Sequence, residues 1–114
     1  METIKDLGAY TFPAMLANTV RKFGDRPAVG YVSGDTITYS EVEATICELR
    51  DRLHRLGIVK GDRVAIYATS GPNWGIAYFS IVTLGAIAVP LLPDFSQKEV
   101  ETCLKHSGAE TVFV

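Results

Sequence analysis

The stretch Val64–Pro93 reads VAIYATSGPNWGIAYFSIVTLGAIAVPLLP and contains no Asp, Glu, Lys or Arg in 30 consecutive residues. Two short apolar runs lie near its ends, VAIYA at 64–68 and AIAVPLL at 86–92, and such runs are typical of strands buried on both faces of a parallel sheet. Between them, residues 74–84 are apolar on almost every face, which is typical of a helix in the core of a large protein. The stretch therefore predicts a β-α-β unit.

A membrane span is the alternative explanation for this stretch, because about 18 or more apolar residues can cross a bilayer as a helix. Small, hydroxyl-bearing and helix-breaking residues interrupt the most apolar window, residues 74–92: Gly75, Ser80, Thr83, Gly85 and Pro90. The sequence Gly71-Pro72-Asn73 breaks the pattern upstream, and no Lys or Arg cluster flanks the window to set an orientation. We therefore expect no membrane span.

Downstream of the stretch, the pattern of strand and helix repeats. Ser96 and Glu99 form a capping box that opens a helix, Gly108 ends this helix, and TVFV at 111–114 reads as a third strand. From residue 64 onward the predicted order is β-α-β-α-β, an α/β fold with a parallel sheet and helices on both faces. Pro90 cannot donate to a strand ladder, so we expect the strand to bend there or the proline nitrogen to face away from its neighbour.

Upstream of the stretch, a helix and a hairpin are predicted first. Thr11 can cap a helix that Gly24 ends. Two β-prone runs follow at 28–32 and 36–39, and the turn Ser33-Gly34-Asp35 between them predicts a β-hairpin.

The helix that follows the hairpin has signals at both ends. Ser40 and Glu43 fit a capping box, and Gly57 stands where a left-handed residue would end the helix, so that Ile58 could pack back on Leu53. Five apolar residues at helical spacing predict its buried face: Val42, Ile46, Leu49, Leu53 and Leu56.

The composition excludes several classes of function. The formal net charge is −2 and the basic residues are scattered, so we expect no nucleic-acid partner and no charged membrane surface. Cys47 and Cys103 lack metal-ligand spacing and read as free thiols in a reducing compartment. The beginning METIKDLGAYTF lacks the pattern of a secretory signal peptide, so we expect a cytoplasmic location.

Few residues suggest chemistry. The loop TSGPN at 69–73 would precede a helix N-terminus, where anions bind, but it has one Gly and no Lys. An ordinary turn with Asn73 or Ser70 as the helix cap is favoured. His54 and His106 lie on charged segments and are interpreted as solvated. From the residues alone we assign no catalytic residue and no metal ligand.

Four segments occur in an order and spacing that is informative as a set. They are FGDRPA at 23–28, TYSEV at 38–42, GIVKGDRVAI at 57–66, and NW at 73–74 with GAIAVPL at 85–91. Together they resemble the motifs of AMP-forming acyl-CoA synthetases, in the adenylate-forming superfamily that includes luciferases and the adenylation domains of peptide synthetases. The resemblance runs from about Thr11 to Val114. The phrase LLPDFSQKEV at 91–100 looks most like bacterial long-chain fatty acid ligases.

This resemblance implies a function for a larger parent protein. The parent would activate a long-chain fatty acid with ATP and Mg²⁺, forming an acyl-adenylate and pyrophosphate, and CoA would then displace AMP. The phosphate loop, the ribose-binding aspartate and the catalytic lysine of the family lie outside the matched segments. Residues 1–114 would thus be an N-terminal piece of the large domain, inactive by itself and without tight binding of ATP, Mg²⁺ or CoA. Gly75 departs from the acidic residue of many members, so no carboxylate role is assigned there.

The resemblance also marks a loop and leaves an alternative open. Leu92, Pro93 and Asp94 correspond to a backbone stretch that lies near CoA in acetyl-CoA-type members. The chain stops at Val114 inside the predicted strand, which favours a piece of a longer protein, and an open strand edge predicts self-association. The alternative is a free-standing flavodoxin-like binding or interaction module.

Overall fold

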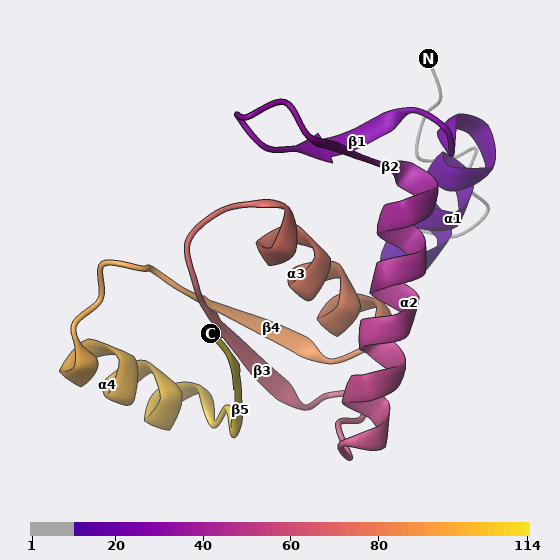
Figure 1. Ribbon diagram of the computed structural model, residues 1–114. Helices are drawn as coiled ribbons and strands as arrows, with labels where there is room; N and C mark the ends of the chain where they lie inside the picture. Colours follow the sequence, from indigo (N-terminus) through magenta and orange to yellow (C-terminus); the bar gives the residue numbers. More distant parts are fainter. Residues whose placement is uncertain (1–10) are drawn as a thin grey trace.

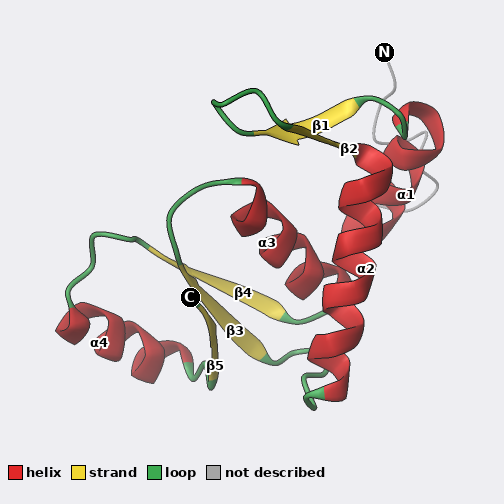
Figure 2. Cartoon of the chain, viewed as in Figure 1, coloured by secondary structure: helices red, strands yellow, loops and turns green. Residues whose placement is uncertain are grey.

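The computed structural model describes residues 11–114 and contains the predicted elements in the predicted order (Figures 1 and 2). The elements are α1 (Phe12–Phe23), β1 (Pro27–Gly30), β2 (Thr36–Thr38), α2 (Tyr39–Arg55), β3 (Arg63–Tyr67), α3 (Pro72–Leu84), β4 (Ile87–Leu91), α4 (Gln97–Ser107) and β5 (Thr111–Phe113). The strands β1 and β2 form an antiparallel pair, and β3, β4 and β5 form a parallel sheet.

The parallel sheet has the strand order β4-β3-β5. Helix α3 connects β3 to its neighbour β4, and α4 connects β4 to β5 on the far side of β3. Right-handed crossovers in opposite directions place the two helices on opposite faces of the sheet, as Figure 1 shows. The predicted α/β fold with helices on both faces is therefore confirmed. Pro90 pairs with Ile66 from the outer strand β4, and an edge strand tolerates a residue without an N–H group.

The main core lies between the central strand and the helices on one face. Val64 and Ile66 of β3 are at most 1% exposed, and they pack with Ile81 of α3 and Leu53 of α2. Helix α3 is thus covered by the sheet on one side and by α2 on another, which explains why its sequence is apolar nearly all round. The buried hydroxyl of Ser80 donates to the Ile76 carbonyl at 2.7 Å, so this polar group is satisfied within the core.

The predicted start of α2 was wrong by two residues. The N-cap is Thr38, whose hydroxyl accepts a hydrogen bond from the Glu41 amide at 3.2 Å, and the Ser40–Glu43 capping box does not form at the N-terminus. The Ser40 side chain lies instead against Gly24, where an added Cβ would approach its Oγ to 2.5 Å. Gly24 follows α1 as predicted but has a right-handed φ of −50°, so it is needed for close approach and not for a left-handed turn.

The C-terminal end of α2 confirms the prediction except at one residue. Gly57 has φ +94°, its amide donates to the His54 carbonyl, and the Ile58 amide donates to the Leu53 carbonyl at 3.1 Å. This is a Schellman motif, with Ile58 and Leu53 buried together. Leu56 was assigned wrongly to the buried stripe: it is 77% exposed, because it caps the helix where the chain turns away.

The other local predictions are confirmed in part. Thr11 caps α1, and Ser96 with Glu99 forms the predicted capping box of α4, which ends at the left-handed Gly108. The hairpin forms, but its loop is longer than predicted, since β1 ends at Gly30 and β2 begins at Thr36.

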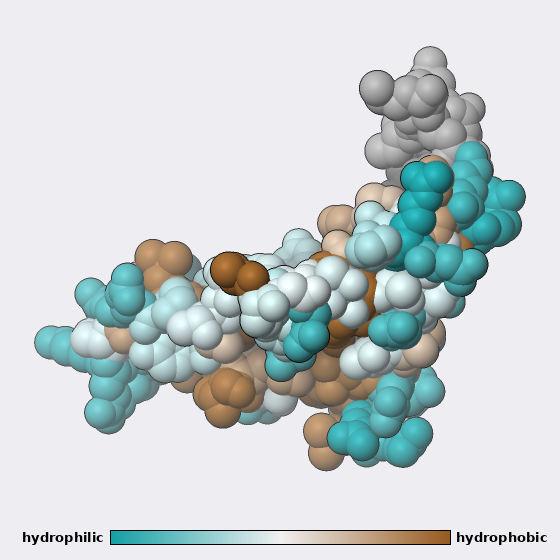
Figure 3. Space-filling model, turned by 45° about the horizontal axis from the view of Figure 1, so that its top comes forward, coloured by the Kyte–Doolittle hydropathy of each residue, from teal (hydrophilic) through white to brown (hydrophobic). Residues whose placement is uncertain are grey.

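No helix within residues 11–114 is long and apolar enough to cross a membrane. Hydrophobic side chains nevertheless reach the face shown in Figure 3 in several separate areas. The large apolar residues with more than half of their surface exposed are Val32, Leu56, Val59, Leu92 and Val114.

Candidate functional site at the carboxyl edge of the sheet

The carboxyl ends of β3 and β4 lie side by side. Tyr67 and Leu91, the last residues of the two strands, are partners in the parallel register. The chain then leaves toward α3 on one face and toward α4 on the other (Figure 1). In open parallel sheets, ligands bind outside the carboxyl ends of the strands, near the point where the strand order reverses, which for the order β4-β3-β5 lies between β3 and β5. This edge is therefore the candidate functional site.

Leu92, Pro93 and Asp94, which the resemblance marked, form the exposed tip of the turn after β4. The Phe95 amide donates to the Leu92 carbonyl at 3.0 Å and closes the turn. Leu91 directly before it is 4% exposed, whereas Leu92 is 63% exposed. A short, closed turn thus presents an apolar side chain and a carboxylate to solvent at the candidate edge.

A tyrosine that the sequence analysis did not single out holds the base of this turn. The hydroxyl of Tyr67 donates to the Phe95 carbonyl at 2.9 Å, across 28 positions of the sequence. The only signal in the sequence is an amphipathic residue at the end of an otherwise aliphatic run, because buried tyrosines usually find a partner for their hydroxyl.

The turn after β3 begins α3 without the predicted cap. The N-cap is Gly71, with no hydrogen bond from a side chain, so neither Asn73 nor Ser70 caps the helix. This turn borders a hollow of about 430 Å³ that also contacts Trp74 and Phe113. The lining of this hollow contains no Lys, Arg, Asp or Glu, and it does not include Leu92, Pro93 or Asp94. An uncharged group fits such a lining better than a phosphate does.

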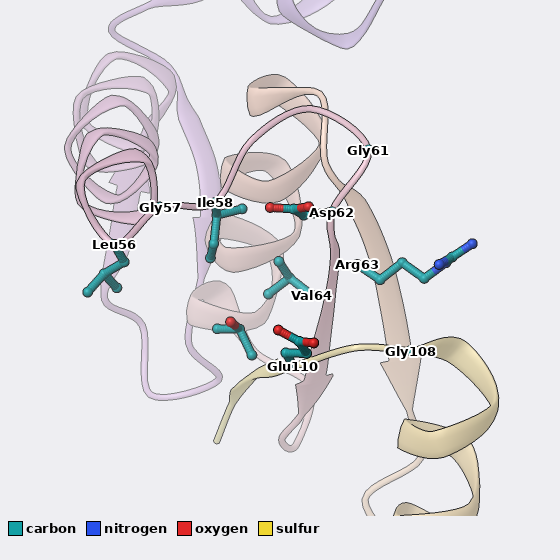
Figure 4. A pocket seen from close by; sticks show the side chains of 10 residues that line it. Leu56, Gly57, Ile58, Gly61, Asp62, Arg63, Val64, Gly108 and Glu110 are labelled. Atoms are coloured by element: carbon teal, nitrogen blue, oxygen red, sulfur yellow. The ribbon is translucent and has the colours of Figure 1, made fainter.

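A second hollow of about 310 Å³ lies at the opposite, amino edge of the sheet (Figure 4). Asp62, Arg63 and Glu110 line it, and Figure 4 shows Arg63 extending away from the two carboxylates. The Asp62 carboxylate accepts a hydrogen bond from the Val59 amide at 2.9 Å and so stabilises its own turn. This hollow is better explained by turn structure than by a ligand.

The described part of the chain contains no group of three or more His, Cys, Asp or Glu side chains that could hold a metal ion. His54 and His106 are exposed, and Cys47 and Cys103 are free thiols of intermediate exposure.

Comparisons with known proteins connect this fold to one family. Residues 16–114 match the family described as AMP-binding enzyme. Surfactin synthase subunit 2 of Bacillus subtilis (strain 168) is 33% identical over 100 residues, which cover 88% of this chain and 3% of that protein. The 4-coumarate–CoA ligase 1 of Petroselinum crispum is 31% identical over 94 residues, which cover 82% of this chain and 17% of the ligase.

A solved structure supports the same relationship. The N-terminal subdomain of Klebsiella oxytoca NpsA, in complex with 3-hydroxybenzoyl-AMSN, superposes with a TM-score of 0.83 at 26% identity. The match covers 88% of this chain and 25% of that one. The chain thus spans less than a fifth of either curated relative named above. By its sequence match and by its fold, the chain belongs to the AMP-binding enzyme family, in the N-terminal part of its adenylate-forming ligases.

Proposed function

We propose that this chain forms part of the large N-terminal domain of an AMP-forming ligase that activates a long-chain fatty acid and transfers it to CoA in the cytoplasm. The observation that carries the proposal is the family match over residues 16–114. The order β4-β3-β5 also begins flavodoxin-like sheets, and the family match is what favours the ligase over a free-standing module.

The proposed reaction has two steps. A carboxylate oxygen of the fatty acid attacks the α-phosphorus of ATP, the bond to the bridging oxygen breaks, and pyrophosphate leaves. The sulfur of CoA then attacks the acyl carbon, its proton is released, and the carbon–oxygen bond to AMP breaks. ATP, Mg²⁺ and CoA belong to the parent enzyme in this proposal. The residues described here contribute the sheet and the turns at its carboxyl edge.

Within this scheme we assign Leu92, Pro93 and Asp94 to the surroundings of CoA. Their position supports the assignment, because the turn is exposed, closed by a hydrogen bond, and located at the carboxyl edge of the sheet, where ligands of open parallel sheets bind. The uncharged lining of the neighbouring hollow is compatible with an uncharged part of a substrate.

Substrate class is the finer part of the proposal. A fatty acid is favoured by the resemblance of residues 91–100 to fatty acid ligases. The family relatives differ in the acids that their names specify, 4-coumarate among them. A test must therefore compare several acids.

The experiment measures thioester formation by the protein encoded by the complete reading frame that contains this sequence. It is incubated with ATP, Mg²⁺, CoA and one acid at a time: palmitate, octanoate, acetate or 4-coumarate. We expect palmitoyl-CoA to form with the highest kcat/KM. Formation of 4-coumaroyl-CoA alone would contradict the fatty-acid assignment, and the absence of any CoA thioester would contradict the ligase.

We also propose that the 114-residue chain by itself associates through β5. The strand β5 pairs with β3 on one side and contains neither proline nor a charged residue, whereas the other outer strand carries Pro90. An unprotected strand edge pairs readily with another chain, and two copies can pair about a two-fold axis. Sedimentation at micromolar concentration should show a dimer or larger species. A monomer with cooperative unfolding and no binding of a hydrophobic dye would contradict this.

A further inference from the structure

We propose that Tyr67 is a positioning residue for the thioester-forming step, because its hydroxyl fixes the turn that presents Leu92, Pro93 and Asp94. This inference rests on the proposed function, in which that turn lies beside CoA. It adds a residue that contacts neither the reacting atoms nor CoA and that acts through the backbone of the turn.

The register of the sheet explains how Tyr67 reaches the turn. Tyr67 ends β3 opposite Leu91, which ends β4, so the turn begins beside the tyrosine ring. The side chain extends along the carboxyl edge, and its hydroxyl donates to the Phe95 carbonyl at 2.9 Å. The tether therefore joins the end of the central strand β3 to the far end of the turn after β4.

Other bonds secure the same short segment. The Phe95 amide donates to the Leu92 carbonyl at 3.0 Å, and the Ser96 amide donates to Glu99 Oε2 at 2.8 Å. Both of these bonds are local, within three residues of sequence. The Tyr67 hydroxyl supplies the tie between this segment and the sheet, and it thereby sets where the exposed tip lies relative to β3.

The position of the tether indicates a role in binding and not in core stability. Leu91 is the last buried residue before the turn, and Leu92 is already 63% exposed. Loss of the hydroxyl would leave the aromatic ring in place and would change only how firmly the exposed turn is held. An effect on a ligand at the turn should therefore exceed any effect on steps elsewhere.

The test uses Tyr67→Phe in the protein from the complete reading frame, with Tyr78→Phe as the matched control. Tyr78 lies on α3, where its ring stacks on Trp74, and within residues 11–114 no hydrogen bond involves its hydroxyl. We expect Tyr67→Phe to raise KM for CoA roughly three- to tenfold, the range expected when one hydrogen bond is lost. Its kcat and its fatty-acid-dependent ATP–pyrophosphate exchange should stay within about twofold of the unmutated enzyme, because Tyr67 does not contact the reacting atoms. For scale, a tenfold change in KM corresponds to about 1.4 kcal/mol.

Hydrogen–deuterium exchange gives a readout that is independent of activity. In Tyr67→Phe the amides of Phe95 and Ser96 should exchange several-fold faster, while those of α3 keep their rates. In Tyr78→Phe the two turn amides should be unchanged.

The outcomes separate the inference from the proposed function. Unchanged amide exchange at Phe95 and Ser96, or an unchanged KM for CoA, would overturn the role of Tyr67. An equal loss in pyrophosphate exchange and thioester formation would indicate a general structural role and would also overturn it. If the unmutated protein forms no CoA thioester, the proposed function fails together with the CoA part of the inference, and faster amide exchange would then support the tether alone.

Discussion

At the amino edge of the parallel sheet the chain turns at glycines with a left-handed φ, whereas the turns at the carboxyl edge after β3 and β4 contain no residue with a left-handed φ. The amino-edge glycines are Gly57, Gly61, Gly85 and Gly108. The Gly61 amide donates to the Gly85 carbonyl at 3.0 Å and the Ile87 amide to the Asp62 carbonyl at 2.7 Å, so neighbouring turns bind each other.

The carboxyl edge differs in exposure and in how it is held. Leu92, Pro93 and Asp94 are exposed there, and the turn is tied to the sheet by a side chain, that of Tyr67. Loops that carry function are usually exposed and held on a rigid scaffold. The amino edge is thus held by hydrogen bonds between neighbouring turns, whereas the carboxyl edge presents an exposed turn that a single side chain ties to the sheet.

The largest difference is expected between two leucines, one beside each edge. Leu53→Ala should lower the free energy of unfolding by about 2–5 kcal/mol, because Leu53 is 3% exposed under the turn at Gly57. Leu92→Ala and Arg52→Ala should change it by less than about 0.5 kcal/mol, since both side chains are largely exposed. Urea midpoints measure the three changes. Equal shifts would show that the buried face of α2 is wrongly assigned.

A glycine at each edge gives a smaller but cleaner contrast. Gly85 has φ +89°, and an added Cβ would meet the Lys60 side chain at 3.2 Å, so Gly85→Ala should cost about 1–2 kcal/mol. Gly71 has an extended φ of 168° with nothing within 4 Å of an added Cβ. Gly71→Ala should therefore stay within about 0.5 kcal/mol in thermal or urea unfolding. A larger loss in Gly71→Ala than in Gly85→Ala would break the comparison.

Of the three substitutions expected to destabilise the protein, removal of the helix cap that follows the carboxyl-edge turn should have the smallest effect. Ser96→Ala removes the hydroxyl that accepts from the Glu99 amide at 3.2 Å and should cost about 1 kcal/mol. Thr102→Ala on the exposed surface of the same helix is the control and should cost nothing, because alanine favours helices. If both variants unfold alike, the capping box does not stabilise α4.

Local signals in the sequence predicted α4 correctly at both ends, because Ser96, Glu99 and Gly108 act within a few residues of one another. They failed at the start of α2, where Thr38 with Glu41 and Ser40 with Glu43 offer two similar patterns. Bonds from distant segments decide between them. The Tyr39 and Ser40 amides donate to the carbonyls of Arg26 and Gly24, which no short window of sequence reveals.

The candidate site was predictable to a smaller extent. A family resemblance marked Leu92, Pro93 and Asp94, and the strand pattern implied that they lie at the carboxyl edge. The bond from Tyr67 to Phe95 was not predictable, since it spans 28 positions and depends on the register of β3 and β4. The absence of a side-chain cap on α3 was also missed, because burial of that helix stabilises it without one.

The central claim is that residues 11–114 provide scaffold and a substrate-facing turn, and that the adenylation chemistry is performed elsewhere in the ligase. Palmitate-dependent ATP–pyrophosphate exchange tests it most directly, measured on the 114-residue chain by itself and on the protein from the complete reading frame. We predict exchange by the complete protein and none by the 114-residue chain above a heat-killed control. Palmitate-dependent exchange catalysed by the 114-residue chain would contradict the claim.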